Sequence, residues 1–151
     1  MNFSNLNLAV TPGHFGQRPP VTKPNPGFLK ELGEEAFREL VSNHYELLKQ
    51  SDISELFPIE DPEEFAAAKK HAADFMIQIC GGPSYFNQSR GAPQMVGRHA
   101  PFKITEKARL RWLECYAMLL PALAQNVSND NIQSFWNYLD VFSQWMVNTP
   151  D

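Results

Sequence analysis

The sequence has little cysteine, and its two cysteines are far apart. Cys80 and Cys115 form no CxxC pair, which excludes a zinc knuckle or a thioredoxin-like redox site. No CxxCH motif occurs, so any haem would be held without thioether bonds. We expect 151 residues of this composition to form one folded domain, and a reducing cytoplasm is the expected location.

Long apolar runs and a strong excess of one charge are also missing. No run approaches the roughly 20 apolar residues that span a bilayer. The segment "MNFSNLNLAVTPGHF" has no basic leader or sustained apolar stretch, so neither a signal peptide nor a membrane segment is expected. The formal charge of −4 gives no electrostatic reason to expect nucleic acid as a partner.

Strand-like alternation of polar and apolar residues is absent too. Instead, apolar residues recur every three or four positions, which predicts helices at roughly 34–50, 62–80, 106–124 and 130–147. Asp61 and Thr105 are predicted N-caps, and Gly33 is predicted to separate a short helix from the first long one. Residues 83–104 are predicted to be loop with a short helix near Met95. The predicted fold class is all-α.

The first 27 residues differ in composition from the rest. They hold five of the twelve prolines, which predicts an extended N-terminal arm over 1–27 and a helical domain over 28–151. The basic side chains of the third long helix and the loop before it are predicted to form a solvated face: Lys103, Lys107, Arg109 and Arg111.

Aromatic residues make up 12% of the chain, which suits a plain core or one that surrounds a large flat ligand. The segment "GGPSYFNQSRGAPQMVGRHAPFKIT" places Arg98 and His99 together at a corner punctuated by glycine and proline. From the residues alone, an exposed loop histidine and a ligand for iron both remain open. Haem iron needs an axial imidazole whose second ring nitrogen donates a hydrogen bond, and a helix corner offers the carbonyls for it.

This segment, followed thirteen residues after His99 by Trp112, resembles the group II truncated haemoglobins. The resemblance rests on a GGP-x-x-Y segment, a Gly-x-Pro turn, an RH-x-PF-x-I stretch and a tryptophan on the next helix, and it extends from about Leu32 to Met146. It implies a truncated globin, a two-over-two helical sandwich around one non-covalent haem b (iron protoporphyrin IX) per chain.

The resemblance also implies roles on the proximal side and around the ring. His99 would be the proximal iron ligand, Arg98 and Tyr85 would pair with the haem propionates, and Phe57 and Phe75 would pack against the ring.

On the distal side the resemblance implies that Trp112 and Tyr45 donate hydrogen bonds to the bound ligand. An ungapped count places His44 where Tyr45 is expected, so both stay open. Ala68 and Ala72 are expected to face the haem and leave room for a ligand. His71 is expected near the distal pocket, where it would reach the iron or lie beside a propionate or in solvent.

The implied function is reversible binding of dioxygen, carbon monoxide and nitric oxide, for oxygen binding, transport, storage or sensing. The alternative is a haem enzyme that detoxifies nitric oxide as a dioxygenase, or reduces peroxide, with electrons from an external reductase. A haem-free helical interaction module is a third hypothesis. No catalytic residue is assigned, and monomer and homodimer both remain open.

Overall fold

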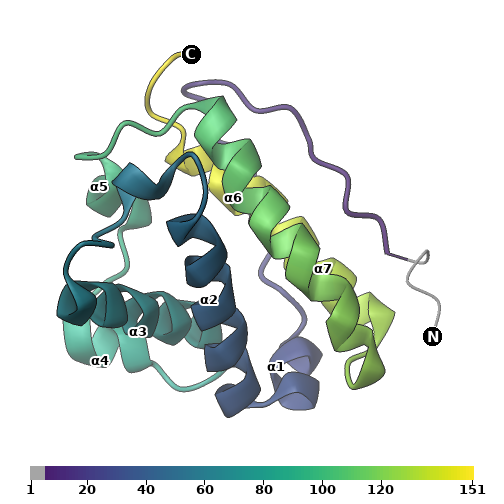
Figure 1. Ribbon diagram of the computed structural model, residues 1–151. Coiled ribbons are helices and arrows are strands. Elements are labelled where there is room, and N and C mark those ends of the chain that lie inside the picture. Colours follow the sequence, from purple (N-terminus) through teal and green to yellow (C-terminus); the bar gives the residue numbers. More distant parts are fainter. Residues whose placement is uncertain (1–5) are drawn as a thin grey trace.

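The computed structural model describes residues 6–151, and the elements within this range are all helices (Figure 1). The longer ones are α2 (Glu34–Lys49), α3 (Pro62–Ile79), α6 (Glu106–Leu119) and α7 (Asn129–Met146). The shorter ones are α1 (Pro26–Leu32), α4 (Tyr85–Arg90), α5 (Met95–His99) and the 3₁₀ segments Ser54–Leu56 and Leu120–Gln125. The all-α prediction is therefore confirmed.

The long helices form two packed pairs. Helix α2 packs on α3, α6 packs on α7, and contacts between α2 and α6 join the pairs. Figure 1 shows α2 and α3 on one side of the molecule and α6 and α7 on the other. This is the two-over-two arrangement that the resemblance implies. No helix of the described range is long and apolar enough to cross a membrane.

The predicted helix boundaries are explained by local hydrogen bonds. The Asp61 carboxylate accepts from the backbone N–H groups of Glu63 and Glu64, at 3.0 and 3.2 Å. The Thr105 hydroxyl oxygen accepts from the N–H of Ala108 at 3.1 Å. These bonds satisfy donors that have no partner inside the helix, so α3 and α6 begin where the sequence predicts.

Helix α4 lies in a stretch that the sequence predicts to be loop, so that prediction is wrong at residues 85–90. Phe86 explains the difference because its side chain is buried and its ring packs edge-on against Phe75, with centroids 5.8 Å apart. One turn and a half is too short for helical periodicity to show, and a tertiary contact stabilises it instead. Helix α6 also ends early, at Leu119, because Pro121 has no N–H to continue it.

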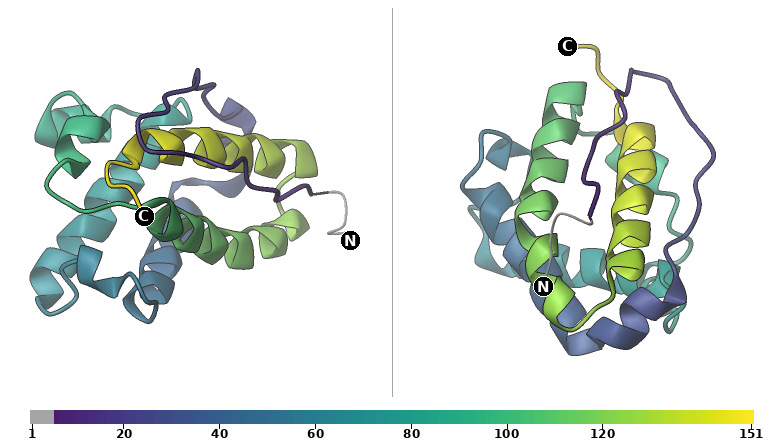
Figure 2. Two further views of the ribbon diagram at one scale, coloured as in Figure 1. Left: turned by 90° about the horizontal axis from the view of Figure 1, so that it is seen from above. Right: turned by 90° about the vertical axis from the view of Figure 1, so that its right-hand side faces the viewer.

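The N-terminal arm lies against the body of the protein. Figure 2 shows residues 6 onward running along the face formed by α6 and α7. The arm gives way to helix α1 at Pro26, just before the predicted boundary at residue 27.

The predicted solvated face on α6 is wrong at Arg109. Its side chain is buried and makes hydrogen bonds to groups on α6, α7 and the arm, among them Asp140 at 2.8 Å. Arg111 remains exposed and pairs with Asp52 on the surface. The helical pattern of α6 does not reveal the difference, because the arm covers only one of its polar sides.

Candidate functional site

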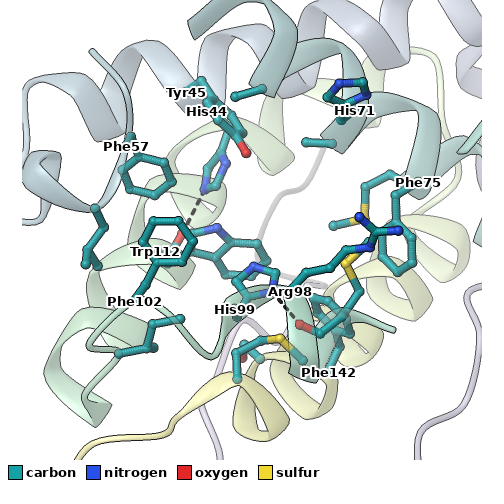
Figure 3. Close-up of a pocket in the computed structure, with 18 of the residues that line it drawn as sticks. His44, Tyr45, Phe57, His71, Phe75, Arg98, His99, Phe102, Trp112 and Phe142 are labelled. Atoms are coloured by element: carbon teal, nitrogen blue, oxygen red, sulfur yellow. Dashed lines mark hydrogen bonds between the residues drawn. The ribbon is translucent and has the colours of Figure 1, made fainter. Parts of the chain in front are cut away.

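A cavity of about 320 Å³ lies between the two helix pairs, and four long helices and the α5–α6 corner contribute to its wall (Figure 3). Nine of the ten residues implied by the resemblance line it: Tyr45, Phe57, Ala68, His71, Ala72, Phe75, Arg98, His99 and Trp112. They come from parts of the chain as far apart as residues 45 and 112, so the fold itself assembles them.

His99 ends helix α5, and its ring is held in one orientation. Nδ1 lies 2.7 Å from the carbonyl oxygen of Met95, and a carbonyl only accepts, so Nδ1 carries the proton. The other nitrogen, Nε2, then keeps its lone pair for a metal or a donor. Burial lowers the pKa of His99, which favours the neutral form that an iron ligand needs.

The C-terminal end of the chain braces the corner that presents His99. The side-chain amide of Asn148 donates to the carbonyl oxygens of His99 and Phe102, at 3.1 and 2.8 Å. Its own carbonyl accepts from the backbone N–H of Ile104 at 2.9 Å. Asn148 therefore fixes the segment on the C-terminal side of the histidine. Sequence reasoning missed it, because nothing in the local pattern links residue 148 to residue 99.

Arg98 lines the cavity and also holds the preceding loop. Its guanidinium donates to the backbone carbonyls of Arg90, Ala92 and Pro93 and lies over the ring of Phe86, 5.1 Å from the centroid. Arg90 lines the same cavity and was not predicted. Two cationic side chains on one part of the wall suit the carboxylates of a bound ligand.

Tyr85 is the predicted residue that is not brought to the cavity. Its hydroxyl donates to the Glu34 carboxylate at 2.8 Å, and the Arg38 guanidinium lies 5.4 Å from its ring centroid. These partners belong to α2, away from the cavity lining. The arrangement in this structure offers no support for contact between Tyr85 and a propionate.

Trp112 and Tyr45 bring hydrogen-bond donors to the cavity. The chain has three tryptophans, and the indoles of Trp136 and Trp145 donate to backbone carbonyls of the arm. The Trp112 indole N–H and the Tyr45 hydroxyl have no hydrogen-bond partner within residues 6–151. Burial raises the pKa of Tyr45 to about 12, so its phenol keeps its proton at neutral pH.

His44 lines the cavity beside Tyr45, so the structure brings both of the open alternatives to it. His44 Nε2 lies 3.0 Å from the carbonyl oxygen of Trp112 and therefore donates to it. The ring stacks on Tyr116, with centroids 3.6 Å apart, and meets Trp112 edge-on. Burial lowers the pKa of His44 to about 3, so the ring is neutral. It holds the backbone and the ring of Trp112 in place.

Helix α3 supplies the small side chains of the wall and one more histidine. Ala68 and Ala72 line the cavity without filling it, and Phe75 packs between Phe86 and Phe142. His71 lies on the same helix (Figure 3), and burial lowers its pKa, with smaller contributions from nearby cations that include Arg90. His71 thus lies toward the cationic part of the wall.

These features fit a haem. The cavity offers an oriented neutral imidazole, donors that have no protein partner, apolar aromatic walls and cations for two carboxylates. His99 would hold the iron, Phe57 and Phe75 would pack on the ring, and Arg90 and Arg98 would face the carboxylates.

A comparison with family models decides the family. The model for the bacterial-like globins matches residues 29–148. The chain belongs to the bacterial-like globin family. The predicted resemblance to group II truncated haemoglobins is confirmed by its relatives, and as a globin of this family the chain is a haem-binding protein.

Among curated proteins, the chain is 32% identical over 84 residues to group 2 truncated hemoglobin YjbI of Bacillus subtilis, which is 56% of this chain and 61% of that protein. The aligned part spans 48% to 61% of the length of the first curated relatives it matches.

Solved structures share the fold over most of the chain. Phosphate-bound Hell's gate globin IV is similar with a TM-score of 0.80 and 36% identity, over 88% of this chain and 81% of that one. A truncated oxygen-avid haemoglobin from Bacillus subtilis is similar with a TM-score of 0.69 and 25% identity, over 80% of this chain and 98% of that one.

Several further residues of the cavity wall were missed by sequence reasoning. Phe102 and Ile104 belong to the RH-x-PF-x-I stretch, so that motif carried a signal for them. The others follow only from tertiary packing: Met76, Phe86, Met95, Tyr116, Phe142 and Met146.

Proposed function

We propose that this globin reversibly binds dioxygen and other diatomic ligands at a single non-covalent haem b. The observation that carries the proposal is the contrast between the tryptophans: the indole N–H of Trp112 faces a cavity without a protein partner, whereas the other two indoles are satisfied. A similar structure is described as that of an oxygen-avid haemoglobin, which agrees with this reading.

The distal residues of this chain would act on the ligand through hydrogen bonds. When haem is bound, its iron would bind the diatomic ligand directly. Dioxygen gains negative charge when bound, so the Trp112 N–H and the Tyr45 O–H stabilise it and slow its release. Carbon monoxide gains much less charge, and the same donors should discriminate between the two gases. His44 keeps Trp112 in position for this role.

The remaining predicted residues would hold the group. His99 would hold the iron through Nε2, since its Nδ1 proton is donated to the Met95 carbonyl. Arg98 pairs with a carboxylate of the haem, and the structure adds Arg90 to that role. The charges of Arg90 and Arg98 help to lower the pKa of His71, and closure of the sixth position by His71 is the competing reading.

The visible absorption spectrum of the purified full chain tests the proposal. We expect a haem spectrum at one equivalent per chain and a clean Soret shift when carbon monoxide is added to the reduced protein. His99→Ala should lose haem or bind it abnormally, while His14→Ala, at an exposed histidine of the arm, should leave the spectrum unchanged. A normal haem spectrum in His99→Ala would refute the proximal assignment.

The absorption spectrum of the protein and the products formed from nitric oxide also distinguish the competing functions. A six-coordinate ferrous spectrum before carbon monoxide is added, lost in His71→Leu, would assign the sixth position to His71. Sustained conversion of nitric oxide to nitrate, with a reductase supplying electrons, would replace the binding function with the dioxygenase one.

A further inference from the structure

The arm is bound to the body at every second residue. The side-chain amide of Gln133 accepts from the backbone N–H of Asn7 at 2.6 Å and donates to its carbonyl oxygen at 2.8 Å. The indole of Trp136 donates to the carbonyl oxygen of Ala9 at 2.9 Å. Asp140 then accepts from the backbone N–H of residue 11 at 2.9 Å.

This series of hydrogen bonds between the arm and the body, here called the ladder, continues onto α6. The Arg109 guanidinium donates to the carbonyl oxygen of Thr11 at 3.0 Å, and the Glu106 carboxylate accepts from the backbone N–H of Gly13 at 3.0 Å. A Cβ atom at Gly13 would lie only 3.0 Å from the Arg109 guanidinium and from the Glu106 carboxylate, so a larger residue would displace these side chains. Residues 7, 9, 11 and 13 therefore face one row of polar side chains.

The apolar residues that alternate with residues 7, 9 and 11 face the core, whereas Pro12 is exposed. Leu6, Leu8 and Val10 are partly buried and pack on the core cluster, as expected for an extended chain whose side chains alternate between two sides. The bonds described so far use backbone atoms of the arm. One further bond uses an arm side chain: the Thr11 hydroxyl donates to Asp140 at 2.8 Å. The face thus recognises mainly the backbone and the alternating apolar side chains of an extended segment.

The receiving face is a row of five side chains, three of which are buried. Gln133, Trp136 and Asp140 recur at three and four residues along one side of α7, and Glu106 and Arg109 extend the row on α6. Trp136, Asp140 and Arg109 are 1%, 8% and 2% exposed. Figure 2 shows the arm lying between these two helices.

The same face forms part of the haem cavity wall. Arg109 and Ser143 both line the cavity, and the Arg109 Nε donates to the Ser143 hydroxyl oxygen at 2.8 Å. If the arm left, a guanidinium N–H and the Asp140 carboxylate would lose their arm partners, and water would reach this side of the cavity wall. The wall is then expected to rearrange.

We propose that α6 and α7 form a binding groove for an extended peptide segment, that residues 7–13 are its intramolecular occupant, and that this occupancy holds the Arg109 wall of the haem cavity in place. The arm thereby becomes a strap that couples the N-terminal segment to haem retention.

Thr11→Pro in the full chain tests this. The change removes the backbone N–H and the hydroxyl that reach Asp140 and leaves the body untouched. We expect amide hydrogen exchange of the arm to rise by roughly tenfold or more, and haem transfer to an acceptor protein to accelerate by a similar factor. Val21→Pro is the control, since Val21 is exposed and its backbone makes no hydrogen bond within residues 6–151.

Gln133→Ala tests the groove from the other side and should also raise exchange at Asn7. Arm amides of the parent that exchange as fast as an unstructured peptide would overturn the groove. Protected amides with unchanged haem transfer in Thr11→Pro would overturn the coupling to the cavity. Protection that appears only in a dimer, by light scattering at rising concentration, would show that the arm of a second copy fills the groove and would overturn the intramolecular assignment.

Discussion

Arg109, which is buried, and Trp112, which is partly buried, lie one turn apart on helix α6, and they differ in how completely their hydrogen bonds are satisfied. Arg109 has five N–H groups, and all of them have partners on Thr11, Glu106, Asp140 or Ser143. The Trp112 indole has a single N–H, and it has no partner within residues 6–151. A saturated buried network stabilises a fold, whereas an unpaired donor that lines a cavity points to a ligand.

Replacing Arg109 should produce the largest effect on folding. Arg109→Met leaves Asp140 and Glu106 as buried or half-buried carboxylates without their cation, which we expect to cost about 3–5 kcal/mol of unfolding free energy. Urea unfolding of the full chain measures it. Arg111→Met is the matched control on the same helix, and it should cost far less because the Arg111 pair is exposed. Equal stabilities for Arg109→Met and the parent would show that apolar packing replaces the network without loss.

Replacing Trp112 should leave folding nearly unchanged and alter ligand release. Trp112→Phe removes a donor to a charged ligand, a bond worth about 1.5–3 kcal/mol, so oxygen dissociation should accelerate by about 10- to 100-fold. Stopped-flow mixing measures this rate. Trp145→Phe is the control, because Trp145 does not line the cavity and its N–H is already bonded to the Pro19 carbonyl, so release should not change. An unchanged rate in Trp112→Phe would remove the indole from the distal site.

His44, whose ring packs edge-on against Trp112, should make the free energy of unfolding depend on pH. Its pKa is lowered from 6.5 to about 3 by burial, so below pH 6.5 the unfolded chain binds a proton that the folded chain does not bind. Stability from this group is therefore full above pH 6.5 and is lost toward pH 3, by about 2 kcal/mol between neutral pH and pH 5.

His44→Gln should flatten that part of the stability profile, and His14→Gln, at an exposed site, should keep the slope of the parent. Unfolding curves at pH 7, 6 and 5 give the comparison. Parallel profiles for all three proteins would mean that His44 is protonated in the folded state as well.

The sequence predicts well those structural features that depend only on residues close together in the chain. The N-caps Asp61 and Thr105, the four long helices and the break at Gly33 all follow from a few adjacent residues. His99 and Trp112 were predicted because a family motif brings together residues that periodicity alone does not relate.

The places where the structure differs from sequence-based expectation, or leaves an expectation as a prediction, share one physical cause. Arg109 was expected in solvent and residues 85–90 in a loop, and both expectations are wrong; contact between Tyr85 and a propionate stays a prediction. Each of the three depends on a contact far away in sequence. Arg109 is covered by the arm, Tyr85 is turned toward Glu34 on α2, and α4 is stabilised where Phe86 meets Phe75. Such contacts leave no mark on the pattern of the segment itself.

The smallest expected effect comes from removing a single hydrogen bond of the Arg109 network. Thr11→Val keeps the shape and the backbone of the arm and removes only the hydroxyl that donates to Asp140, so we expect a loss of about 0.5–1.5 kcal/mol in urea unfolding. Thr22→Val, in the same arm, is the control. Asp140 keeps Arg109 and a backbone N–H after the change, which is why the loss is smaller than in Arg109→Met. A loss equal to that of Arg109→Met would mean instead that the arm, and not the ion pair, carries the stability of this network.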